Sequence, residues 1–297
     1  MQTDLNSAIT AASLRLGLPM WFMEAWRGNL LAAGQVSRTA LTDYSRAFAS
    51  VEGNTTFYGL PAAERVWQWQ AQVPPHFRFC FKLPRSVSHA ADLLQAYAGE
   101  RSQWQAFCAQ LAQQLGVVTL QLPAEFSPSR LSELLDFIAL LQQDSGAEVS
   151  VELRHPAFFN KGQEEQALLR GLQQLGAGRT VFDSRGLFAD ASTSDEVRDA
   201  QLKKPRMPVH PVATSRAPVV RFIGHSDWQR NLTYLSQWQQ KLQQWLAEGR
   251  TPYFFIHTAG NTDVQYFVRF IESLWQLPAA DWAGENEAGR TEDLFSV

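Results

Sequence analysis

Short apolar runs alternate along the chain with longer segments in which apolar residues recur every third or fourth position. The short runs have the length of β-strands, and the longer segments have the period of amphipathic helices. The strand-like runs occupy residues 14–18, 48–52, 77–82, 117–122, 148–153, 179–183, 219–223 and 253–257. The main helix-like segments are 61–72, 99–115, 129–143, 164–175, 232–246 and 264–275. Strands that alternate with helices in this way predict an α/β fold, a (β/α)8 barrel of the TIM type.

A doubly wound open sheet is the alternative that the same alternation allows. Neither GxGxxG nor GxxxxGK[ST] occurs in the chain, so the usual nucleotide-binding versions of that fold lose support. We expect a single barrel domain over residues 14–277, preceded by an N-terminal arm, 1–13, and followed by a flexible acidic tail, 278–297. Between the sixth and seventh strands lies an unusually long connection, 184–218, of the length found in lids and excursions.

Composition indicates an ordinary globular protein rather than a disordered or strongly basic one. The 297 residues are 45% hydrophobic, and the net charge is -3. The two cysteines do not make a disulfide framework, and no apolar run has the length of about 20 residues that spans a bilayer. The N-terminus lacks the basic and apolar regions of a signal peptide, so we expect a cytoplasmic protein.

Polar residues follow or end almost every predicted strand. In a barrel of parallel strands, chemistry gathers at the carboxyl ends, and side chains two positions apart share a face. We therefore expect these residues to form a ring. The candidate catalytic residues are Glu52, Glu152 and Asp183, and the candidate substrate-binding residues are Trp21, Asn54, Thr55, Lys82, His89, Gln121, Arg154, His155, Arg221 and His257.

Each of these residues, taken singly, also has a structural interpretation. Glu152 and Arg154 can form a buried ion pair, Asp183 can cap a loop, and His257 can be a hydrogen-bonded core histidine. Burying a single polar group costs a few kcal/mol unless it is paired. A ring of charged and amide groups of both signs, at the same level of the barrel, is more typical of a binding site than of a core.

Five motifs that fall on successive strand ends carry a family resemblance. They read EGNTT, FCFKLPRSVSH, LQLP, VELRHPAFF and VVRFIG, and in this order they resemble the YecE-like family, known as domain of unknown function 72. The resemblance extends from about residue 14 to residue 275 and implies a TIM-type barrel, but it implies no settled activity. Two departures affect the first and seventh strands. Gly17–Trp21 reads GLPMW where the family has GTSGW, and after Arg221 the family pattern R-x-H-G is replaced by RFIG, with a histidine following as His225.

The first functional hypothesis is an enzyme, of the hydrolase or lyase type, that acts on an anionic substrate at the barrel mouth. Lys82, Arg154 and Arg221 are expected to converge as cations, and arginine grips phosphate with two parallel donors. Glu52 and Glu152 are the expected acid/base groups. Phosphate-bearing sugars and nucleic acids both fit this chemistry.

Two other hypotheses stay open at this point. A metal-dependent barrel, resembling an endonuclease or an isomerase, is the second, but no HExxH or HxH pair occurs and the neighbouring cations would repel a metal. A divalent metal is therefore not favoured, no metal ligands are assigned, and the cofactor is unknown. The third is a non-catalytic protein that binds nucleic acid or another ligand through a basic group of Lys203, Lys204, Arg206, Arg216 and Arg221.

The C-terminal residues suggest one further partner. Asp293, Leu294 and Phe295 resemble the end of the short peptide that docks on the bacterial sliding clamp. No membrane partner is expected.

Overall fold

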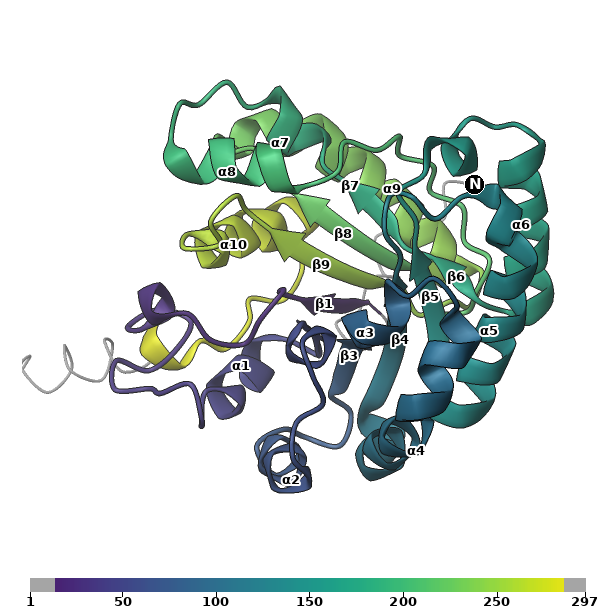
Figure 1. Ribbon diagram of the computed structural model, residues 1–297. Helices are drawn as coiled ribbons and strands as arrows, with labels where there is room; N and C mark the ends of the chain where they lie inside the picture. Colours follow the sequence, from purple (N-terminus) through teal and green to yellow (C-terminus); the bar gives the residue numbers. More distant parts are fainter. Residues whose placement is uncertain (1–13, 286–297) are drawn as a thin grey trace, which may run out of the picture.

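The computed structural model describes residues 14–285 and shows a barrel of parallel strands surrounded by helices (Figure 1). Its strands form two arcs, ordered β1-β9-β8-β7 and β2-β3-β4-β5-β6, and every pairing within them is parallel. The strands are β1 Arg15–Gly17, β2 Ser50–Gly53, β3 Arg78–Lys82, β4 Leu115–Gln121, β5 Glu148–Glu152, β6 Gly178–Arg179, β7 Val181–Asp183, β8 Val219–Ile223 and β9 Tyr253–His257. The (β/α)8 barrel predicted from the sequence is confirmed, and the open sheet is excluded.

The two arcs are joined by the sixth predicted strand, which is divided between them. Its first half, β6, pairs with β5, whereas its second half, β7, pairs with β8. Only Thr180 separates the halves, and its amide donates to the Val151 carbonyl oxygen at 2.9 Å. One continuous segment therefore carries the sheet from one arc to the other.

The two arcs meet again where β1 lies beside β2, and there a tyrosine replaces part of the ladder. One direct backbone bond crosses, from the Glu52 amide to the Leu18 carbonyl oxygen at 3.0 Å. The buried Tyr44 hydroxyl accepts from the Leu18 amide at 2.8 Å and donates to the Ser50 carbonyl oxygen at 3.0 Å. Tyr44 thus satisfies two backbone groups that regular pairing would otherwise satisfy.

Helices cover the outside of the barrel (Figure 1). Helix α5 shows why they dock: its buried residues, Leu134, Phe137, Ile138 and Leu141, follow the spacing of one helix face. Helix α4 begins six residues earlier than the sequence pattern indicates, because Asp92 caps it by accepting from the Gln95 amide at 2.9 Å. The helices are α1 Leu41–Ala47, α2 Ala63–Ala71, α3 Arg85–Ser88, α4 Leu93–Leu111, α5 Leu131–Ser145, α6 Gln163–Leu175, α7 Arg185–Ala189, α8 Asp195–Lys203, α9 Leu232–Ala247 and α10 Val264–Trp275.

The long connection between β7 and β8 is ordered around α7 and α8, which lie together at the top of Figure 1. Helix α8 buries Val197 and Ala200 in a small apolar cluster with Phe182, Leu187 and Ile223. Through this cluster, α8 packs directly against the carboxyl ends of β7 and β8.

A buried ion pair anchors the second half of the connection. Arg179 donates to Glu165 at 2.9 Å, and the same carboxylate oxygen lies 2.8 Å from Nδ1 of His210. Arg179 also donates to the His210 carbonyl oxygen at 3.3 Å. The connection therefore returns to the barrel along α6 as a defined path.

Packing continues beyond residue 277, where the sequence suggested that a flexible tail begins. Trp282 is only 1% exposed, and the Arg269 guanidinium lies 3.6 Å from the centre of its ring. Residues 278–285 therefore belong to the packed part of the molecule. The expected arm, 1–13, and the proposed clamp-binding residues Asp293, Leu294 and Phe295 lie outside the described residues. No helix within residues 14–285 is long and apolar enough to cross a membrane.

Candidate functional site

The carboxyl ends of the strands bring polar side chains together above an apolar layer inside the barrel. That layer contains Cys80, Val117, Val219, Tyr253 and Phe255. Alternate side chains along a strand share a face, so the next inward side chains toward each strand's carboxyl end lie at the mouth of the barrel. The predicted residues that meet there are Glu52, Lys82, Gln121, Glu152, Arg154, Arg221 and His257.

Arg221 is the centre of this arrangement, which we call the mouth network. Its Nε donates to Glu52 Oε2 at 2.9 Å, and its Nη1 donates to Glu152 Oε2 at 2.7 Å. These residues come from three strands, β2, β5 and β8, so one guanidinium connects both arcs of the barrel. Arg154 then donates to the other oxygen of Glu152 at 2.7 Å.

Lys82 and His257 complete the surroundings of Glu52. The Lys82 amine lies 3.3 Å from Glu52 Oε1 and donates to Gln121 Oε1 at 2.8 Å. His257 Nε2 lies 3.4 Å from Glu52 Oε2. Both carboxylates are therefore enclosed by positive or hydrogen-bonding groups, beneath the surface of the mouth.

A cavity of about 500 Å³ opens above the network. Its wall includes four cationic side chains of the network and its surroundings, Lys82, Arg154, Lys204 and Arg221, together with Gln121 and His257 on the polar side. Neither Glu52 nor Glu152 lines it. A ligand in the cavity would therefore meet the cations of the network before Glu52 and Glu152; the one acid at the wall, Asp199, is paired with Lys203.

Lys204 is a site residue that strand-end reasoning missed. It follows α8 in the long connection, where the sequence suggested only a basic group with Lys203 and Arg206. The fold turns its side chain into the mouth cavity, and within residues 14–285 it has no carboxylate at ion-pair distance. The cluster of basic residues at positions 203, 204 and 206 was the only signal in the sequence.

Burial and mutual charge set the protonation of the network. Burial alone would raise the pKa of Glu52 and Glu152, but Arg221 and Lys82 outweigh it, holding the Glu52 pKa well below its usual range and the Glu152 pKa at about 2. Burial, reinforced by Arg221, lowers the pKa of Lys204 to about 8. Burial also lowers the pKa of His257 to about 4, so this histidine is neutral near pH 7.

Asp183 and His155, both predicted site residues, do not face the cavity. Asp183 points outward, where Arg185 lies 2.8 Å away and the Trp238 indole donates to it at 2.7 Å. Phe182, its neighbour on β7, occupies the inward position instead. His155 caps the short 3-10 helix Pro156–Phe159 by accepting from the Ala157 amide at 3.3 Å.

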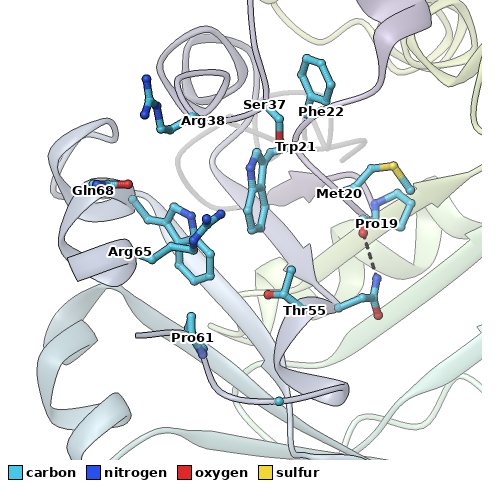
Figure 2. Close-up of a pocket in the computed structure, with 13 residues that line it drawn as sticks. Pro19, Met20, Trp21, Phe22, Ser37, Arg38, Thr55, Pro61, Arg65 and Gln68 are labelled. Carbon is cyan, nitrogen blue, oxygen red and sulfur yellow. Dashed lines mark hydrogen bonds between the residues drawn. The ribbon is translucent and has the colours of Figure 1, made fainter. Parts of the chain in front are cut away.

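Four other predicted residues lie around the mouth rather than in the network. His89 ends α3 and packs edge-on against Phe57, with ring centres 5.5 Å apart. Asn54 reaches the cavity and donates to the Pro19 carbonyl oxygen at 2.9 Å. Trp21 and Thr55 line a neighbouring pocket, shown in Figure 2.

The basic residues of the long connection do not form one surface track. Lys203 pairs with Asp199 at 2.6 Å, and the Arg206 guanidinium lies 5.6 Å from the centre of the Phe188 ring. Arg216 precedes β8 and therefore lies toward the opposite end of the barrel from Lys204. This placement gives no support to a nucleic-acid backbone following the connection.

The described part of the chain contains no group of three His, Cys, Asp or Glu side chains placed to hold a metal ion. The carboxylates at the mouth are instead bridged by Arg221, and Lys82 lies beside Glu52. The metal-dependent hypothesis therefore gains no support from the geometry.

Comparison with known proteins agrees with the sequence motifs. A family model described as "Protein of unknown function DUF72" matches residues 15–287. The UPF0759 protein YecE of Escherichia coli K12 is 41% identical over 267 residues, covering 88% of this chain and 91% of that protein. The relative from Escherichia coli O157:H7 is 40% identical over the same length.

Solved structures show the same fold. A DUF72 family protein from Enterococcus faecalis V583 has a TM-score of 0.67 and 18% identity, over 91% of this chain and 98% of that one. A DUF72 family protein from Thermotoga maritima MSB8 has a TM-score of 0.60 and 19% identity, over 87% and 99% of the two chains. The fold, the five motifs and the sequence matches lead to one conclusion: this chain belongs to the DUF72 family.

Proposed function

We propose that this protein is an enzyme that binds a small anionic substrate, of the phosphate type, in the mouth of its barrel. The observation that carries the proposal is Lys204. This partly buried amine faces a cavity already lined by Lys82, Arg154 and Arg221, and within residues 14–285 no carboxylate pairs with it. An unpaired, desolvated cation is costly, and a bound anion would supply the missing partner.

The charges around the cavity support an anionic ligand. Lys82, Arg154, Lys204 and Arg221 are matched by only two carboxylates, Glu52 and Glu152, which lie behind them and are already engaged. The other two charges at the wall, Lys203 and Asp199, pair with each other and cancel. An excess of two positive charges therefore remains at the mouth. Arg154 is half-buried at the rim and can present a flat pair of donors to phosphate oxygens.

The acid/base chemistry of the proposed enzyme belongs to Lys204 rather than to the carboxylates. Groups that exchange protons efficiently have pKa values near the working pH. A Glu152 pKa of about 2 keeps this carboxylate ionised, whereas a Lys204 pKa of about 8 lets the amine both donate and accept. We assign Glu52 and Glu152 the role of holding Lys82, Arg154 and Arg221 in position.

Ligand-induced stabilisation tests the binding. We expect sulfate, inorganic phosphate and ribose 5-phosphate to raise the melting temperature of the wild type, since a ligand at 100 times its Kd adds about 2.7 kcal/mol. Lys204→Met and Arg154→Ala should reduce the shift. Arg170→Ala, an exposed arginine on α6, is the matched control and should not. Equal shifts in all four proteins, or no shift in any, would contradict the proposal.

Turnover is tested with a panel of phosphate esters and sugar phosphates, with product detection by mass spectrometry. Lys204→Arg keeps the positive charge but cannot release a proton near neutral pH. We expect this variant to bind the substrate and to lose turnover. Full turnover by Lys204→Arg would remove Lys204 from the proton-transfer step.

A further inference from the structure

A second pocket, of about 430 Å³, is shown in Figure 2 and lies beside the mouth cavity, with which it shares lining residues. We call it the aromatic pocket. Its apolar wall is built from the loop after β1, from Pro61 just before α2, and from Trp69 of α2. The loop after β1 contributes Pro19, Met20, Trp21 and Phe22. This wall differs from that of the mouth cavity, where charged and amide groups predominate.

The two spaces share part of their wall. Pro19, Met20 and Asn54 line both of them. The Asn54 side chain is fixed there because its amide donates to the Pro19 carbonyl oxygen at 2.9 Å. A single extended molecule can therefore occupy both the mouth cavity and the aromatic pocket, passing over these three residues.

Trp21 is the residue best placed to contact a planar ring. Its own ring meets Trp69 edge-on, with centres 5.1 Å apart and planes at 69°. Trp69 is fixed in turn, because it is buried and stacks on Phe81 at 5.6 Å. Trp21 is only half-buried and stands in the middle of the pocket in Figure 2, so part of its ring is available to a ligand.

Two arginines stand at the edge of the same pocket. Arg38 and Arg65 are exposed, and within residues 14–285 neither guanidinium has a hydrogen bond or an ion pair. In Figure 2 both lie on the Trp21 side of the pocket. A guanidinium without a fixed partner can stack on a planar ring or contact a polar edge of it.

We propose that the ligand of the mouth carries a planar aromatic ring, and that this ring binds in the aromatic pocket against Trp21. The substrate class is then a phosphate joined to an aromatic ring system, either a nucleoside phosphate or an aryl phosphate. The pocket has the volume of ordinary small-molecule sites, which begin at about 300 Å³. This inference rests on the proposed function, since the phosphate group occupies the mouth.

Isothermal titration calorimetry with matched probes tests the inference. Adenosine 5′-monophosphate and ribose 5-phosphate differ by the aromatic base, and phenyl phosphate and inorganic phosphate differ by the phenyl ring. We expect at least one aromatic probe to bind about 5- to 150-fold more tightly than its partner, the range that stacking on one aromatic side chain provides. A preference for the nucleotide alone would assign a nucleoside phosphate, and a preference for both probes would assign aromatic phosphates in general.

Variants separate the aromatic pocket from the mouth. Trp21→Ala should abolish the advantage of the aromatic probe and leave ribose 5-phosphate or inorganic phosphate binding unchanged, while Trp21→Phe should keep most of it. Trp67→Ala removes a tryptophan of α2 that is 61% exposed and does not line the pocket, so it should change neither affinity. Lys204→Met should weaken every probe.

Three results would overturn the inference. The first is equal affinity of the aromatic and non-aromatic probes for the wild type, which leaves the proposed function intact. The second is an aromatic advantage that survives in Trp21→Ala. The third is a loss of ribose 5-phosphate binding in Trp21→Ala with a normal melting temperature, because Trp21 would then act on the mouth itself. Failure of all four probes to bind would count against the proposed function as well.

Discussion

Arg221, on one arc of the barrel, holds two buried carboxylates, Glu52 and Glu152, that both come from the other arc. Each carboxylate accepts a hydrogen bond from Arg221, at 2.9 Å for Glu52 and 2.7 Å for Glu152, so neither acid is isolated from a counter-charge. A buried ion pair of this kind contributes little net stability when complete, but breaking it leaves a charge without compensation. The mouth network therefore couples the chemistry of the site to the stability of the fold.

Glu152→Gln tests this coupling at the level of one residue. At pH 7 the variant should unfold about 3–5 kcal/mol more easily than the wild type, because Arg221 and Arg154 lose a charged partner. Urea unfolding monitored by circular dichroism provides the measurement. Glu164→Gln, an exposed acid on α6, is the control and should change stability by less than about 0.5 kcal/mol.

The low pKa of Glu152 also predicts how the stability difference between wild type and Glu152→Gln depends on pH. The folded pKa of Glu152, about 2, lies below the ordinary value of 4.5, so its stabilising contribution is complete above about pH 5 and is lost as pH falls toward 2. The difference in unfolding free energy between wild type and Glu152→Gln should therefore shrink over this window. A difference that stays constant from pH 6 to pH 3 would contradict the assignment of a low pKa.

The pKa of Lys204 predicts a second pH dependence, that of anion binding. Because burial lowers its pKa to about 8, its positive charge is present at pH 7 and is lost as pH rises above this value. Sulfate affinity should fall between pH 7 and pH 9.5, and the fall should be smaller in Lys204→Met. Sulfate is the suitable probe because its own charge is constant over this range. Parallel pH profiles for wild type and variant would show that another group is responsible.

At the scale of elements, α8 decides where Lys204 lies. Ser194 caps the helix by accepting from the Val197 amide at 3.3 Å, and Val197 and Ala200 bury the inner face. Lys203 and Lys204 follow at the end of this helix, and so its docking sets the position of the unpaired amine over the mouth. The barrel strands supply the other cations independently of α8.

Val197→Ser should therefore weaken anion binding more than it disturbs the barrel. We expect the polar replacement to loosen α8, lowering sulfate affinity several-fold while the far-ultraviolet circular dichroism spectrum stays close to that of the wild type. Leu202→Ser alters a residue on the same helix that is 87% exposed, and should leave the affinity unchanged. Equal sulfate affinity in all three proteins would show that α8 does not position the site.

At the scale of the whole molecule, the two arcs of the barrel are joined in two different ways. The split strand β6 and β7 joins the arcs through continuous chain, whereas β1 and β2 meet through one direct backbone bond and the Tyr44 hydroxyl. Packing at residues 278–285 adds to this, since Trp282 is covered by Arg269 of α10. The Gly284 amide also donates to the Asn29 carbonyl oxygen at 3.0 Å, so the first and last parts of the described chain lie together.

Tyr44→Phe tests the closure between β1 and β2. Loss of the hydroxyl leaves the Leu18 amide and the Ser50 carbonyl without this partner, and each buried group left unsatisfied costs about 1–3 kcal/mol. We expect urea unfolding to show destabilisation in this range. Tyr58→Phe, at a tyrosine that is 85% exposed, is the control and should unfold like the wild type. Equal stability of the two variants would mean that the hydroxyl contributes nothing to closure.

The sequence alone determined the barrel and most of the mouth network. Both rest on local geometry: strands and helices have distinct periods, and parallel strands place their carboxyl ends at one level. Counting two positions at a time was enough to predict that Lys82, Glu152, Arg221 and His257 share a face, and the structure brings them together with Glu52.

The tertiary structure alone decided which other residues join them. Asp183 ends its strand as expected, but the register of β7 points Phe182 inward, and only pairing with neighbouring strands sets that register. Lys204 reaches the mouth because α8 folds back over it, and Trp21 lies in a pocket formed with α2. Such contacts join residues far apart in the chain, so no local period encodes them, whereas strand alternation is a property of each segment by itself.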